Sequence, residues 1–272
     1  DMGALPAVRD ALERATREAK QAEWVRALGD PDALARIRVG YLGMRWTRDW
    51  RLLQDAPDKL AQAIPESHAS PVLDGLRSVM QAGTREIAII SPYFVPGDDG
   101  ARALVDGVRG GRKIRVLTNS LASNDVAAVH GGYVRHREML VRGGVDLWEL
   151  KPRSDQAPGS LFGSSGARLH GKAAVIDRET LFVGSMNLDP RSVALNSEQG
   201  LLVTDAVLAG QLLTLFERMT RPENAWSLAW DPTRNRLLWR DAGGVRDREP
   251  DAGMMRRTVA RMAYWLPVDP LL

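Results

Sequence analysis

Hydrophobic and polar residues follow two different periods along the chain, and the period changes near Pro71. Before this point, Val8, Leu12 and Trp24 recur at helical spacing in a stretch rich in Ala, Arg and Leu. We therefore expect residues 1–65 to form a helical linker or packing segment. After it, segments of helical period alternate with short, continuous apolar runs, which is typical of helices alternating with buried strands.

Alternating helices and strands predict an α/β fold, a mixed and largely parallel sheet flanked by helices in an α/β/α sandwich. Asp177-Arg178-Glu179-Thr180 separates the last two strands, and this spacing predicts a hairpin. We expect a domain over residues 66–222 and a C-terminal extension, 223–272, packed on that domain or on a membrane surface. The predicted helices are 71–81, 101–108, 126–141 and 206–219, and the predicted strands are 86–91, 113–118, 145–150, 173–176 and 181–183.

The composition narrows the classes of function. A chain of 272 residues that is 44% hydrophobic and 26% charged is an ordinary globular sequence. No cysteine is present, so there is neither a disulfide framework nor a thiolate nucleophile. No apolar stretch approaches the roughly 18 residues of a membrane-spanning helix, so any membrane contact is expected to be peripheral. The net charge of +3 suits phosphate-bearing partners, either anionic lipid or nucleic acid.

His170 and Lys172 have the spacing of catalytic groups. On a strand they project from the same face, because side chains alternate with a period of two, whereas Asp177 has the opposite parity. An imidazole can attack phosphorus and form a covalent phospho-histidine, and a neighbouring ammonium stabilises charge on the phosphoryl oxygens. Asp177 is better suited to fixing local structure than to contacting substrate.

A second polar cluster follows the predicted hairpin. Ser185 and Asn187 share a face in Gly184-Ser185-Met186-Asn187 and could donate hydrogen bonds to phosphate oxygens. A catalytic histidine also needs an acceptor that fixes its tautomer and orientation. Glu198 is the candidate for that acceptor.

Four other segments allow two interpretations each. Thr118, Asn119, Ser120 and Asp125 lie where a strand ends and a helix begins, so they could cap the helix or contact substrate. His130, Tyr133 and Arg137 follow helical spacing and could line a cleft or pack in the core. Met254 to Leu266 has the pattern of a basic amphipathic helix, which could lie at a membrane interface or dock on the domain. The loop from Arg153 to Gly166 could rim a site or be disordered.

The order and spacing of three segments resemble the catalytic motif of the phospholipase D superfamily. They are LHGKAAVID at 169–177, VGSMNLDPRS at 183–192 and LNSEQG at 195–200. Residues 91–100, residues 117–137 and the closing LPVDPLL resemble the bacterial cardiolipin synthase branch. The resemblance implies transfer through a phosphatidyl-histidine with neither a metal nor another cofactor. It implies the catalytic residues His170, Lys172, Asp177 and Glu198, with phosphate contacts at Ser185, Asn187, Asn119 and His130.

The chain departs from that family in carrying one motif, whereas family enzymes use two. His68, His130 and His136 are not followed two positions later by lysine. We therefore expect the chain to correspond to the second catalytic half. Its site would be completed by the missing first-motif half or by a second copy in a homodimer, and the half could be inactive alone.

The expected function is that of a cardiolipin synthase-type phosphatidyltransferase that acts on phosphatidylglycerol and a second phospholipid. By resemblance, the expected location is peripheral, at the bacterial cytoplasmic membrane. Two alternatives stay open: a phosphodiesterase or nuclease acting on nucleic acid, and a non-catalytic half that scaffolds a partner.

Overall fold

The fold is that of a computed structural model, which describes residues 45–57, 59, 70–124, 127–152 and 169–265 together with Asp10, Glu13 and Asp32. The chain divides into two compact units, Asp1–Arg48 and Asp49–Leu272, and every element named below belongs to the second. The predicted loop 153–166, the closing LPVDPLL and Asp125 lie outside the described residues.

Sixteen helices and strands of this unit are described, and most coincide with the predicted segments. The helices are α4 (Pro71–Ala82), α5 (Gly97–Arg109), α6 (Ala127–Arg142), α7 (Pro190–Ala194), α8 (Ala206–Met219) and α9 (Met254–Trp265). The strands are β1 (Trp50–Gln54), β2 (Glu86–Ile90), β3 (Lys113–Asn119), β4 (Asp146–Leu150), β5 (Lys172–Ile176), β6 (Thr180–Gly184), β7 (Gln199–Thr204), β8 (Ala225–Asp231), β9 (Arg236–Asp241) and β10 (Gly244–Arg246).

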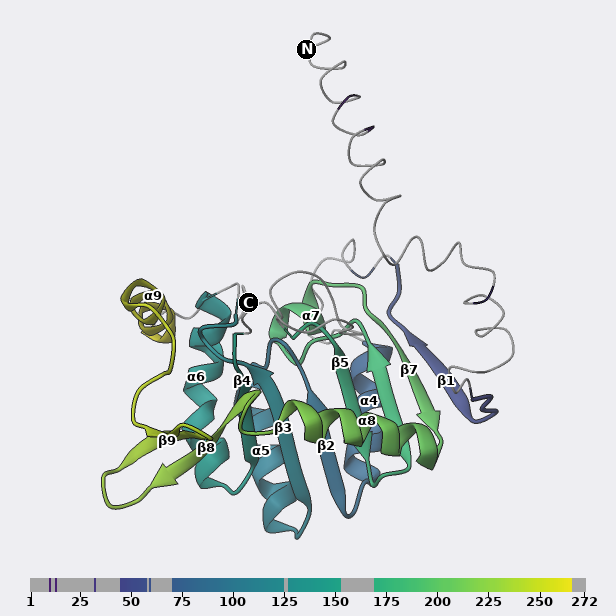
Figure 1. The fold of residues 1–272 in the computed structure, drawn as a ribbon. Helices are drawn as coiled ribbons and strands as arrows, with labels where there is room; N and C mark the ends of the chain where they lie inside the picture. Colours follow the sequence, from purple (N-terminus) through teal and green to yellow (C-terminus); the bar gives the residue numbers. More distant parts are fainter. Residues whose placement is uncertain are drawn as a thin grey trace. The chain divides into compact units, whose positions relative to one another are not determined.

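Within the described ranges, ten strands form one sheet in the order β1-β7-β6-β5-β2-β3-β4-β8-β9-β10 (Figure 1). The predicted α/β class, with a mixed sheet flanked by helices, is confirmed. The expectation of a largely parallel sheet is wrong, because only the β2–β3 and β3–β4 pairs are parallel and the remaining pairs are antiparallel. Hairpins, including the predicted one between β5 and β6, reverse the chain and produce antiparallel pairs.

Helices cover the two faces of the sheet unequally. Ile87 and Ile89 of β2 pack in a cluster with residues of α5 and α6, whereas Ala88 and Ile90 face α8. All five residues of β2 are buried, as expected for a central strand with helices on both sides. Helix α4 lies on the same face as α5 and α6, since Ile89 is paired with Ala174, which packs with α4. Helix α8 lies on the other face (Figure 1).

The sheet extends beyond the expected 66–222 region on both sides. Strand β1 falls within the segment 1–65 and pairs with β7. Strands β8 to β10 fall within the extension 223–272 and continue the sheet from β4. Helix α9 follows them and packs on α6. None of the helices in the described part of the chain is both long and apolar enough to cross a membrane.

Candidate active site

All of the candidate residues except Asp177 and His130 lie near the point where five strand ends meet. Strands β2 and β3 are parallel and end together, and β5 begins beside the end of β2 because it runs antiparallel to it. Lys172, Gly184 and Gly200 form one cross-strand row through β5, β6 and β7. His170 therefore precedes this row, while Ser185 and Glu198 lie just beyond it. This is the edge at which ligands bind in open α/β sheets.

Two glycines allow close packing behind the site. Gly184 and Gly200 lie opposite each other on β6 and β7. A Cβ at Gly200 would come within 2.2 Å of the ring of Phe182, and a Cβ at Gly184 would come within 2.6 Å of the Gln199 carbonyl oxygen. The glycine of the Gly-Ser-x-Asn segment is thus required by packing. Any side chain here would push the site strands apart.

His170 and Lys172 lie together as their spacing predicts. The imidazole is exposed, whereas Lys172 is only 8% exposed. Lys172 Nζ donates to the His170 carbonyl oxygen at 2.8 Å and lies 3.5 Å from His170 Nδ1. The buried ammonium is therefore held against the residue whose imidazole faces solvent.

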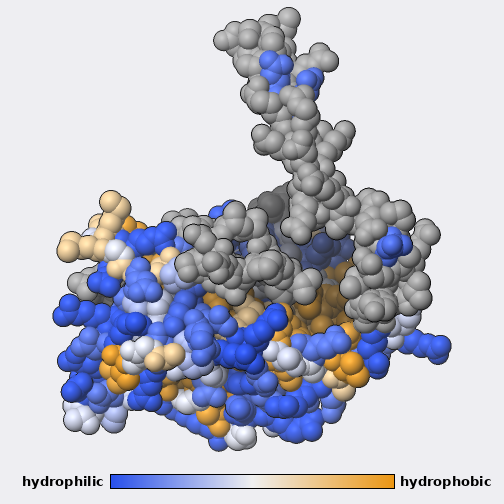
Figure 2. All heavy atoms as spheres, in the orientation of Figure 1, coloured by the Kyte–Doolittle hydropathy of each residue, from blue (hydrophilic) through white to orange (hydrophobic). Residues whose placement is uncertain are grey.

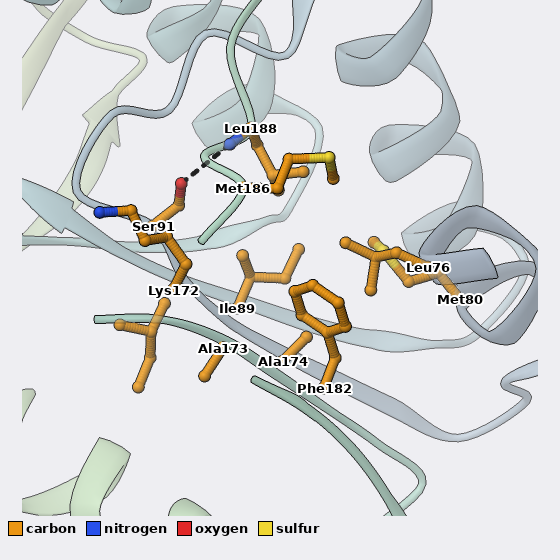
Figure 3. Close-up of a pocket in the computed structure, with 11 residues that line it drawn as sticks. Leu76, Met80, Ile89, Ser91, Lys172, Ala173, Ala174, Phe182, Met186 and Leu188 are labelled. Carbon is orange, nitrogen blue, oxygen red and sulfur yellow. Dashed lines mark hydrogen bonds between the residues drawn. The ribbon is translucent and has the colours of Figure 1, made fainter. Parts of the chain in front are cut away.

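The stem of Lys172 borders a small apolar cavity of about 10 Å³. Figure 3 shows the ammonium directed away from Phe182, Met186 and Leu76, which line the opposite side. Ser91, at the polar side, donates its hydroxyl to the Tyr93 carbonyl oxygen and accepts from the Leu188 amide at 3.1 Å. Burial of the stem limits the rotamers of Lys172 and fixes its ammonium.

Glu198 holds Ser185 rather than His170, which corrects our expectation. Ser185 Oγ donates to Glu198 Oε2, and Asn196 Nδ2 donates to Glu198 Oε1 at 3.1 Å. Within the described residues, no hydrogen bond joins Glu198 to His170. The reason is local: Ser185 follows β6 and Glu198 precedes β7, so the β6–β7 pairing brings them together.

The side-chain amide oxygen of Asn187 could accept a hydrogen bond from a ligand. Its backbone N–H donates to Ser192 Oγ at 3.2 Å, while its Oδ1 is buried with no hydrogen-bond partner within the described part of the chain. A buried acceptor without a partner is unfavourable unless a donor arrives. A hydroxyl group of a substrate would supply one.

Asp177 lies at the opposite end of β5, on the hairpin turn. Its backbone has φ +55°, and its carboxylate accepts from the backbone N–H groups of Thr84, Arg85 and Glu86 at 2.8–2.9 Å. Burial opposes ionisation, but these hydrogen bonds outweigh it and lower the pKa of Asp177. Five residues of strand, roughly 17 Å, separate it from Lys172, so its described contacts are structural.

His130 lies in a buried polar network, not in the exposed cluster around His170. It is 1% exposed, and its Nε2 lies 3.3 Å from Glu249 Oε1. Arg137 bridges Glu249 and Glu149 at 2.8 and 3.0 Å, and Tyr133 donates to Glu149. Burial by itself would raise the pKa of Glu249. The neighbouring His130 and Arg137 outweigh this effect and lower that pKa to about 2. The predicted face of His130, Tyr133 and Arg137 therefore packs inside the protein.

Asn119 also differs from the expected phosphate contact, since both ends of its amide bond the backbone of Leu169. Thr118, beside it, donates to the Pro92 carbonyl oxygen. Sequence reasoning missed Asp55, a buried carboxylate that accepts from Lys59 Nζ at 2.6 Å, from Ser70 and from the Glu198 amide. Asp55 directly follows β1, whose sequence WRLLQ has no pattern that would have marked the aspartate.

Comparisons with known proteins identify related sequences. The family model described as "Cardiolipin synthase, PLD-like domain" matches residues 76–220. Cardiolipin synthase C of Escherichia coli (strain K12) is 40% identical over 241 residues, covering 86% of this chain and 50% of that protein. Cardiolipin synthase B of the same strain is 30% identical over 186 residues, 64% of this chain and 40% of that protein. This chain therefore spans half or less of the length of these relatives.

Among solved structures, Nuc of Salmonella typhimurium, a phospholipase D family member, aligns with a TM-score of 0.45 and 16% identity. The alignment covers 62% of this chain and 91% of that one. The family model covers more than half of the chain and includes every predicted site residue, and the resemblance inferred from the motifs is confirmed. The chain belongs to the phospholipase D-like domain family of cardiolipin synthases.

Proposed function

We propose that this chain is the second catalytic half of a cardiolipin synthase-type phosphatidyltransferase. The reaction moves a phosphatidyl group from phosphatidylglycerol to a headgroup hydroxyl of a second phospholipid, with water as the competing acceptor. The observation that carries the proposal is the exposed imidazole of His170 beside the buried ammonium of Lys172, in a member of this family.

The geometry suits a double displacement at phosphorus. In one role, an imidazole nitrogen of His170 forms an N–P bond while the bond from phosphorus to the departing glycerol oxygen breaks. A general acid protonates that oxygen. The acceptor hydroxyl then attacks phosphorus, loses its proton to the same group and releases the histidine. In the other role, His170 is that acid and base for the first-motif histidine.

The residues around His170 have matching roles in this proposal. Lys172 stabilises charge on the phosphoryl oxygens, where a charge-assisted bond is strongest because the stem is buried. Asn187 can donate to the phosphate from its amide Nδ2. Ser185 gives its only hydroxyl hydrogen to Glu198, so its contact with phosphate requires exchange of that hydrogen bond. Asp177 acts at a distance by fixing the turn after β5.

A second motif would complete the site, from either the first-motif half or a second copy of this chain. An apolar row beside the site supports this part of the proposal. Leu52, Leu201 and Val183 lie directly opposite one another on β1, β7 and β6 and are 55%, 37% and 40% exposed. Val183 lies two residues before Ser185. Figure 2 shows hydrophobic residues reaching the surface on the α8 face.

Peripheral membrane contact is proposed through α9. Met255, Val259 and Met262 recur at i, i+4 and i+7 and are exposed, while the helix packs on α6. The helix carries no acidic residue. An exposed apolar stripe on a basic helix is the arrangement that binds the interface of anionic bilayers. The proposed location is the surface of the bacterial cytoplasmic membrane.

Nucleic acid is the alternative substrate, and the arginine-rich groove between α5 and α6 is its strongest support. The groove has a volume of about 720 Å³ and is lined by Arg102, Arg109, Arg135 and Arg142. Three of these arginines are paired with acidic residues of their own helices, Asp99, Asp106 and Glu138. Because that pairing reduces the field that would attract a phosphate backbone, we favour the lipid substrate.

Incubation with labelled phosphatidylglycerol vesicles tests the function. We expect cardiolipin and free glycerol from the wild type, accompanied by a phospho-histidine adduct, and neither from His170→Ala. His68→Ala, a histidine outside the motif, controls for the loss of an imidazole. A folded chain that gives neither product nor adduct would contradict activity of this half alone. Cleavage of DNA that weakens steeply with salt would overturn the substrate assignment.

A further inference from the structure

The backbone just before His170 is held by one buried side chain. Asn119, the last residue of β3, donates from Nδ2 to the Leu169 carbonyl oxygen at 3.2 Å. Its Oδ1 accepts from the Leu169 N–H at 3.1 Å. Both residues are buried, at 3% and 4% exposed. The two hydrogen bonds mimic the pairing of a β-ladder, and within the described ranges no strand residue pairs with Leu169.

The orientation of this amide is itself fixed. Asn119 is paired with Leu150 on β4, so its backbone belongs to the rigid centre of the sheet. Ser123 Oγ lies 2.9 Å from the Leu150 carbonyl oxygen and 3.3 Å from Asn119 Oδ1. A flipped amide would place its NH₂ against the Leu169 N–H and lose both bonds. The side chain therefore has one favourable orientation.

The turn that follows Asn119 is held from the C-terminal helix. Arg256 Nη1 of α9 lies 3.0, 3.1 and 2.8 Å from the carbonyl oxygens of Leu121, Ala122 and Asn124. These contacts tie α9 to the backbone of the turn. A continuous set of hydrogen bonds thus runs from α9 through the β3–α6 turn to the residue before His170.

We infer that Asn119 is a positioning residue for His170. It fixes Leu169 on one side of the histidine, while Lys172 Nζ holds the His170 carbonyl oxygen on the other. The backbone of His170 is therefore restrained on both sides, at Leu169 and at its own carbonyl group, even though its imidazole is exposed. This role rests on the proposed function of His170, and it replaces a phosphate contact for Asn119.

The role predicts a loss of rate rather than of binding. A catalytic group displaced by about 1 Å can lose on the order of 100-fold in rate. We expect Asn119→Ala to lower kcat roughly 10- to 100-fold and to change KM by less than about threefold. Ser123→Ala, which supports the amide without touching Leu169, should give a smaller loss of the same kind. Asn224→Ala is the matched control, because its amide also donates to a backbone carbonyl, that of Arg218.

A second readout does not depend on turnover. The chain has four histidines, so the imidazole resonances of His170 can be assigned by comparison with His170→Ala. We expect Asn119→Ala to broaden or shift those resonances and to speed carbethoxylation of His170, while Asn224→Ala leaves both unchanged. If the wild type proves inactive, these measurements still decide whether Asn119 restrains His170, so failure of the proposed function is distinguishable from failure of this inference.

Hydrogen exchange of backbone amides in the wild type tests the inference even if the Asn119→Ala variant fails to fold. The Leu169 N–H should exchange as slowly as the amides of central β5. Fast exchange at Leu169, or an Asn119→Ala variant with unchanged His170 resonances and unchanged kcat, would overturn the inference.

Discussion

At the scale of single residues, the two carboxylates of the motif region have different tasks because their partners differ. Glu198 is 6% exposed and receives side-chain donors from Ser185 and Asn196, beside the candidate site. Asp177 receives three backbone N–H groups at the other end of β5. A carboxylate that satisfies backbone donors of a neighbouring segment ties two parts of the fold together. The spacing in the motif therefore places the candidate site at one end of β5 and a structural carboxylate at the other.

Replacement of Asp177 by alanine should reduce stability without removing chemistry. Three backbone donors would lose their acceptor, so we expect the free energy of unfolding to fall by about 1–3 kcal/mol. Urea denaturation at pH 7 measures this change. Phospho-histidine formation per folded molecule should stay near the wild-type level. Loss of the adduct with unchanged stability would contradict the structural role.

The same variant gives a test by pH. Because the pKa of folded Asp177 lies below its ordinary value of 3.8, its stabilising contribution is complete above that value. The contribution is lost as the pH falls through the lower, folded pKa. The difference in stability between wild type and Asp177→Ala should therefore be constant near neutral pH and shrink below about pH 4.

At the scale of elements, local patterns predicted more than non-local ones. Helices α4, α6 and α8 and the β5–β6 hairpin follow from periodicity, caps and turn residues, all of which are local. Strand β1 was missed because its register with β7 involves residues about 150 positions away. The antiparallel pairings of β1 with β7, β2 with β5 and β4 with β8 were missed for the same reason, because they too join residues far apart in the sequence. His170 and Lys172 lie close together as expected, although His170 precedes β5, which begins at Lys172. The partner of Glu198 depends on which strand ends meet.

Helix α9 shows what the sequence left open, since both of its interpretations have support. It packs on α6 and also exposes Met255, Val259 and Met262. We expect Met255→Ser/Val259→Ser/Met262→Ser to bind anionic vesicles at least about tenfold more weakly in flotation, because three buried apolar contacts with lipid are lost. Val245→Ser, an exposed valine on β10, is the matched control. Equal binding by both variants would show that α9 does not contact the membrane.

At the scale of the whole molecule, the two faces of the sheet are unequally covered. Helices α4, α5 and α6 lie on one face, whereas α8 lies on the other (Figure 1). The row of Leu52, Leu201 and Val183 stays exposed on the α8 face and ends beside Ser185. This chain, which spans half or less of the length of its relatives, thus has an apolar surface next to the candidate site.

If two copies of the chain associate through this row, a single charge placed in it should weaken their association. If two copies complete each other's sites, Leu201→Arg should shift the monomer–dimer equilibrium at least about tenfold toward monomer, because an unpaired guanidinium would be buried in an apolar interface. Val245→Arg, on β10 at the opposite edge of the same sheet, is the control. Sedimentation equilibrium over a range of concentrations measures the monomer–dimer equilibrium of both variants.

Because the row lies beside Ser185, phospho-histidine formation should fall in parallel with dimer content. Raising the protein concentration to restore the dimer should then restore the adduct. Dimers that persist in Leu201→Arg would place the contact elsewhere, and a wild type that is monomeric yet forms the adduct would show that one motif suffices.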